Sequence, residues 1–163
     1  MYVAGEDGGN QVYAVSTNGG FSYSRPKVIG PVADLVDPIP GSTFRNDSFL
    51  SLAADPRAKS KTLYAAWVNR TVADGSAAEL VVFRTDGAGW SKVATPYAGS
   101  VTGKGVPFFQ GLDVSGDGRV DPGWQAMAAI DPATFGPGHA ALNAHYPPLP
   151  LGGQCSSPPP PTR

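Results

Sequence analysis

The chain has 163 residues, enough for one modest domain, and its net charge of −1 leaves no basic surface for a nucleic acid or an anionic membrane. Twenty-one glycines and seventeen prolines, with 15% charged residues, favour turns and short strands over helices. No apolar run approaches the roughly 20 residues that cross a bilayer, and the first ten residues lack the basic start and apolar core of a signal peptide. The single cysteine, Cys155, excludes an internal disulfide.

The pattern of apolar residues predicts an all-β chain. No segment places apolar residues at i, i+3, i+4 and i+7 with helix caps, whereas short alternating runs are separated by Gly, Pro, Asn or Asp. In chain order, the predicted strands span residues 11–16, 22–29, 48–54, 62–68, 79–85, 90–95, 108–114, 119–130 and 140–146.

These predicted strands recur in a fixed pattern. Residues 12–29 and 80–97 each comprise a strand, an Asn/Asp-Gly turn, an aromatic residue with a serine, and a second strand. Residues 49–70 and 108–128 each comprise an apolar strand, an Asp-containing turn and a strand with a tryptophan. Four-stranded antiparallel meanders repeating at about 40 to 50 residues are typical of β-propeller blades. A β-sandwich is the alternative, but it does not predict the same turn chemistry at the same place in each unit.

The stretch STNGGFSYS carries the motif that indicates a family. Its spacing matches the Asp-box, S-x-D-x-G-x-T-W, at Ser16, Asn18, Gly20, Ser22 and Tyr23. Asp86 and Trp90 resemble a second, degenerate copy that is one residue shorter. Over residues 10–146 the chain therefore resembles the sialidase-like (Asp-box or BNR-repeat) β-propeller superfamily.

The resemblance implies a structural role for the Asp-box residues. In that superfamily the motif is a hairpin between the third and fourth strands of a blade, on the rim and away from the substrate pocket. An Asx side chain can accept backbone N–H bonds across its own turn, which suits this role. We therefore expect Ser16 to Tyr23 to hold a hairpin and not to bind a ligand.

The blade pattern predicts a fragment of a β-propeller with about two and a half four-stranded antiparallel blades. Since propellers close with four to eight blades, we expect a piece of a longer secreted protein whose other blades are its partners. The predicted units are the end of one blade (1–29), a Pro-rich insertion (30–44), a complete blade (45–97), a partial blade (98–146) and a disordered Pro-rich tail (147–163).

A sialidase-type site implies three arginines on the substrate carboxylate, an acid/base aspartate, and a tyrosine nucleophile paired with a glutamate. Only Arg45 is a catalytic candidate: Phe44-Arg45 matches half of the family's Phe/Tyr-Arg-Ile-Pro motif. No tyrosine has a glutamate at a suitable spacing, so the full catalytic set is not visible and the sequence leaves enzymatic activity open. The loop acids are interpreted as solvated; they are Asp34, Asp37, Asp74 and Glu79.

The stretch DVSGDGRVD resembles the calcium hairpin loops of integrin-type propellers. Gly118 permits the tight turn, and calcium prefers several oxygen ligands of this kind. The candidate ligands are Asp113, Ser115, Asp117, the carbonyl of Arg119, and Asp121. The alternative is a simple Asp-Gly hairpin without metal, and calcium is the one candidate cofactor.

Two functions remain at this point. The first is a segment of a sialidase-like propeller whose extracellular parent hydrolyses or binds sialylated or other glycans, with this piece alone inactive. The second is a non-catalytic, calcium-stabilised propeller module for adhesion or protein interaction.

Overall fold

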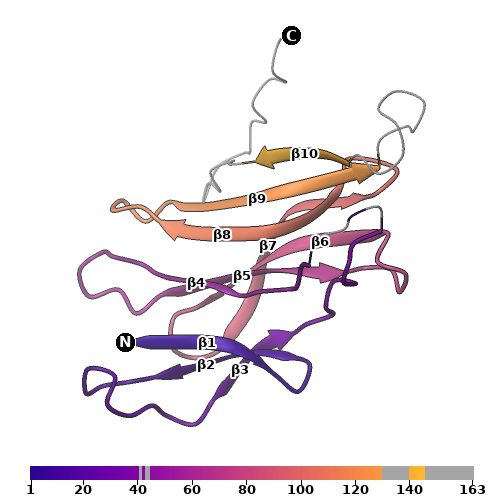
Figure 1. The fold of residues 1–163 in the computed structure, drawn as a ribbon. Coiled ribbons are helices and arrows are strands. Elements are labelled where there is room, and N and C mark those ends of the chain that lie inside the picture. The colour runs from indigo at the N-terminus through magenta and orange to yellow at the C-terminus, as the bar shows by residue number, and fades with distance from the viewer. Residues whose placement is uncertain (41, 43–44, 130–139, 146–163) are drawn as a thin grey trace.

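The computed structural model describes residues 1–40, 42, 45–129 and 140–145 (Figure 1). This part of the chain contains strands, turns and bends and no helix, which confirms the all-β prediction. Its strands are β1 (Tyr2–Asp7), β2 (Asn10–Val15), β3 (Lys27–Pro31), β4 (Ser51–Ala54), β5 (Leu63–Arg70), β6 (Ala77–Thr85), β7 (Trp90–Ser100), β8 (Val106–Val114), β9 (Val120–Ala129) and β10 (Ala140–His145). Accordingly, no described helix could cross a membrane.

The strands form three antiparallel sheets in chain order: β1-β2-β3, β4-β5-β6-β7 and β8-β9-β10. Figure 1 shows them as three stacked layers, with β4 to β7 in the middle. Each sheet is a meander in which sequential strands pair. Within the described ranges these sheets do not close into a ring.

Four strands differ clearly from the sequence prediction: β1 was not predicted, β3 and β7 have other bounds, and β4 begins at Ser51 and not at residue 48. The strand β1 was missed because all six of its residues are exposed, so burial imposes no alternation on it. The strand β3 begins at Lys27 and not at residue 22, because the residues before it belong to the hydrogen-bonded turn described below and Pro26 has no N–H to donate. The strand β7 runs to Ser100, beyond the predicted end at residue 95.

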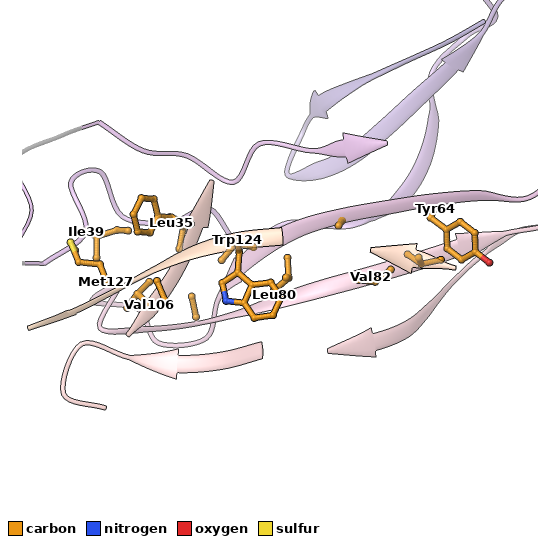
Figure 2. Close-up of a cluster of buried hydrophobic side chains, with 14 of the residues drawn as sticks. Leu35, Ile39, Tyr64, Leu80, Val82, Val106, Trp124 and Met127 are labelled. Carbon is orange, nitrogen blue, oxygen red and sulfur yellow. The ribbon is translucent and has the colours of Figure 1, made fainter. Parts of the chain in front are cut away.

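The middle sheet is buried on both faces. Along β5, Tyr64, Ala66 and Val68 pack toward the third sheet, while Ala65 and Trp67 pack toward the first. This alternation follows from the two-residue period of a strand, and it explains why β5 is apolar on both faces. The core on the side of the third sheet is the larger and includes Leu80, Val82, Val106, Trp124 and Met127 (Figure 2).

Candidate functional site

The Asp-box-like segment forms the turn between β2 and β3, and its own polar side chains close it. The Ser16 hydroxyl donates to Oδ1 of Asn18 over 2.9 Å and accepts from the Gly20 N–H over 2.8 Å. The same Oδ1 accepts from the Ser22 N–H at 3.0 Å, and the Asn18 amide donates to the Ser22 hydroxyl at 2.8 Å. Gly20 has φ +95°, a conformation that glycine adopts without strain. The motif's polar groups therefore serve the hairpin.

The aromatic residue of this motif, Tyr23, does not enter the core. Its side chain is 40% exposed, and its hydroxyl donates to the sulfur of Met1 at 3.0 Å. Phe21 beside it is 93% exposed. The Asp-box-like segment thus closes its turn through hydrogen bonds and not through a buried aromatic ring.

The second, degenerate copy lies in the equivalent place, between β6 and β7. The Asp86 carboxylate accepts from the Ala88 N–H at 3.3 Å, and the Thr85 hydroxyl accepts from the Gly87 N–H at 3.1 Å. Trp90 packs edge-on against Tyr13 of β2, with ring centroids 5.4 Å apart. Here the aromatic residue does join the first and middle sheets.

The predicted calcium loop is the hairpin between β8 and β9, and its oxygens hydrogen-bond within the hairpin. The Asp117 carboxylate accepts from the Ser115 hydroxyl and from the Arg119 N–H, and the Arg119 carbonyl accepts from the Ser115 N–H. Both oxygens of Asp121 bind the Arg119 guanidinium, at 2.9 and 3.1 Å. The Ser115 hydroxyl lowers the pKa of Asp117, and Asp121 raises the pKa of Arg119.

The catalytic candidate Arg45 lies at the surface. Its side chain is 87% exposed, and its guanidinium lies 3.7 Å from the Asp37 carboxylate. Exposed pairs of this kind hold neither side chain in one geometry. The arrangement therefore does not prepare Arg45 to bind a substrate carboxylate.

Three other arginines line one open cavity of about 620 Å³: Arg57, Arg84 and Arg119. Two of their charges are neutralised, because Arg57 binds Asp55 at 2.6 Å and Arg119 binds Asp121. The hydrogen bonds from Arg57 hold the pKa of Asp55 well below its usual range. Since Arg84 is the penultimate residue of β6, this cavity lies at the end of the middle sheet that carries the hairpin between β6 and β7.

An acidic cluster that the sequence did not indicate lies at one end of the first sheet. This end is the one away from the turn between β2 and β3. We use this name for Glu6, Asp34 and Asp47, whose carboxylate oxygens lie within 4.8 Å of one another; no other such trio occurs in the described ranges. Glu6 is on β1 near the Gly8-Gly9 turn, whereas Asp34 and Asp47 lie in the connection from β3 to β4. Asp34, interpreted as a solvated loop acid, is half-exposed, but its Oδ1 is buried.

The connection from β3 to β4 is held over this end of the sheet by Gln11 and Ser48. The Gln11 amide donates to the Ser48 carbonyl at 2.9 Å, and the Ser48 hydroxyl accepts from the Leu35 N–H at 3.0 Å. Asp47 accepts from the Ser48 N–H at 2.7 Å. The pKa of Glu6 is raised by partial desolvation of its carboxyl, by the charge of and a hydrogen bond with Asp34, and by the charge of Asp47.

A second open cavity, of about 450 Å³, lies along β8 and β9. It combines aromatic, amide and carboxylate side chains: Phe109, Trp124, Gln110, Gln125, Asp113 and Asp121. Phe109 is 46% exposed and has φ +47°, at a break in the register between Phe108 and Gly111. A non-glycine residue in this conformation is strained, and such strain concentrates at functional sites.

Comparisons with protein-family models, with curated proteins and with solved structures found no match to this chain.

Proposed function

We propose that this chain is part of an extracellular, sialidase-like Asp-box β-propeller that binds glycans, as a hydrolase or as a lectin. The order of the strands supports the propeller. If β1 to β3 are the last three strands of one blade and β4 to β7 a whole blade, both Asp-box segments join a third strand to a fourth. The strands β8 to β10 would then begin the next blade, and the remaining blades of the parent would be partners.

The observation that carries glycan binding is Phe109. At a bulge in β8, the partly exposed ring of Phe109 lines the cavity on β8 and β9. The positive φ of Phe109 at this bulge strains the backbone. Aromatic rings supply an apolar face with little conformational entropy to lose, and a few fixed polar groups then orient the ligand. In this cavity Gln125 and Asp113 supply an amide and a carboxylate for sugar hydroxyls, whereas the Gln110 amide donates to the Phe49 carbonyl.

The rival function, a calcium-stabilised module, predicted metal at the hairpin between β8 and β9. Its carboxylates accept hydrogen bonds from Ser115 and Arg119, which supports the simple hairpin at that place. The glycan proposal is therefore the better supported of the two.

The test is binding of the chain to an array of sialylated and neutral glycans, followed by titration of the best ligand. We expect Phe109→Ala to weaken binding by about tenfold or more, about 1.4 kcal/mol. Phe21→Ala is the matched control because Phe21 is exposed but lies on the Asp-box hairpin. A folded chain that binds no glycan, or that binds equally well with Phe109→Ala, contradicts the proposal.

A fluorogenic sialoside separates the two forms of the proposal. Hydrolysis by a longer protein that contains this chain would make it an enzyme. Array binding without hydrolysis would make it a lectin-like module.

A further inference from the structure

The strands β1 and β2 aim two polar side chains at the same place. Glu6 and Gln11 are directly paired across the antiparallel ladder, so their side chains project from the same face of the sheet. The hydrogen bond from the Gln11 amide to the Ser48 carbonyl places Asp47 and Ser48 over that face. Glu6, Gln11, Asp47 and Ser48 all line one cavity of about 310 Å³.

Two buried oxygens at this place have no hydrogen-bond donor. Gln11 is only 1% exposed, and its side-chain N–H₂ donates to the Ser48 carbonyl. Its Oε1 is a buried acceptor without a hydrogen-bond partner. Oδ1 of Asp34 is also buried and without a partner. Buried acceptors in this state are costly, and each one requires an explanation such as a bound ion.

The charge of the acidic cluster is also uncompensated. None of the ion pairs found among the described residues involves Glu6, Asp34 or Asp47. Carboxylates this close repel one another, and a bound cation removes that repulsion.

We propose that Glu6, Asp34 and Asp47, together with the Oε1 of Gln11, form a binding site for a calcium ion. All four groups are hard oxygen ligands, which calcium and magnesium prefer, and the cluster contains no His or Cys for zinc. Calcium bonds its ligands at 2.3–2.6 Å, so two oxygens bound to one ion are at most about 5 Å apart, and one carboxylate oxygen from each of the three residues lies within that limit. Magnesium requires a smaller and more regular shell.

The ion would tie together two segments that are distant in sequence. Glu6 and Gln11 belong to the hairpin of the first sheet, whereas Asp34 and Asp47 belong to the connection that enters the middle sheet. The site is separate from the hairpin between β8 and β9 and from the proposed glycan cavity. It can therefore be tested independently of glycan binding.

The test is calorimetric titration of calcium chloride into the chain after treatment with a chelator, together with thermal unfolding. We expect one site with a Kd of about 10⁻⁴ to 10⁻³ M, the range of extracellular calcium modules. At about 10 mM calcium the melting temperature should rise by about 3 to 10 °C. Magnesium at the same concentration should give a smaller rise.

Glu6→Gln and Asp47→Asn each remove one ligand charge and should weaken calcium binding by about tenfold or more. Asp47→Asn keeps an oxygen for the Ser48 N–H, so it is the variant expected to fold like the parent. Asp7→Asn is the matched control: it removes the adjacent charge on β1 but lies on the other face of the strand. Asp117→Asn tests the hairpin between β8 and β9 in the same way.

Calcium binding that persists in both ligand variants, or that is lost with Asp117→Asn, would overturn the assignment. So would the absence of binding heat and of a melting shift in a chain that circular dichroism shows to be folded. If Glu6→Gln does not fold, the Asp47→Asn titration decides.

Discussion

Gly30 of β3 lies so close to Phe83 of β6 that no β-carbon fits between them. A β-carbon at Gly30 would lie 2.9 Å from Cε1 of the Phe83 ring. That ring cannot easily move away, because it stacks on Trp67 with centroids 4.5 Å apart and planes 21° apart. The first and middle sheets therefore meet at a point where only glycine allows the observed approach.

Gly30→Ala should lower the free energy of unfolding by about 1 to 3 kcal/mol, the usual cost of adding a methyl to a well-packed contact. Urea unfolding monitored by tryptophan fluorescence would measure it. Gly111→Ala is the control because a β-carbon at this strand position has nothing within 4 Å. Equal effects at the two positions would mean that the sheets do not pack as closely as the structure shows.

The hydrogen bonds of Asn18 in the turn between β2 and β3 imply opposite outcomes for two substitutions at this residue. Asn18→Ala removes the acceptor for the Ser16 hydroxyl and the Ser22 N–H and should cost about 1 to 2 kcal/mol. Asn18→Asp retains that acceptor, and its second oxygen can accept from the Ser22 hydroxyl, so stability should be unchanged or higher. Chemical denaturation of both variants tests this, and a loss of stability with Asp as large as that with Ala would contradict it.

Asp55 should make stability depend on pH in the acid range. Its pKa in the folded state is lowered by the hydrogen bonds from Arg57 and Ser60, so its contribution is complete above the unfolded pKa of about 3.9 and is lost as pH falls below it. Melting temperatures should therefore fall as the pH is lowered from about 4.5 to about 2. Asp55→Asn should be less stable at neutral pH and should decline less steeply in acid; an unchanged acid slope would exclude Asp55 as its source.

Replacing Phe109 should abolish glycan binding while leaving the stability of the chain nearly unchanged. Phe109→Gly removes the strain of the positive φ, which should stabilise the chain by about 1 to 2 kcal/mol. It also removes the half-buried ring, which should destabilise the chain by about 1 kcal/mol. These effects offset one another, so the unfolding free energy should change by less than about 1 kcal/mol while glycan binding is lost. A destabilisation above about 2 kcal/mol would mean that the ring is there for packing.

The sequence alone predicted the all-β class and most of the strands, because both depend on neighbouring residues. Two-residue alternation and Asn/Asp-Gly turns are local signals, and the strands β5, β6, β8 and β9 were found within two residues of their ends. The turn between β2 and β3 was predictable for the same reason, since the hydrogen bonds among Ser16, Asn18, Gly20 and Ser22 join residues at most four positions apart. The family resemblance and the glycan function stay predictions.

The tertiary structure decided what depends on residues far apart in the chain. Asp34 and Asp47 come from a Pro-rich connection with no motif, and only the pairing of β1 with β2 and the bond from Gln11 to Ser48 bring them to Glu6. The calcium loop from Asp113 to Asp121 stays a prediction: its spacing suits calcium, and in this structure Ser115 binds Asp117 and Arg119 binds Asp121. Spacing specifies which ligands are available locally, whereas hydrogen-bond competition and long-range packing decide which of them converge.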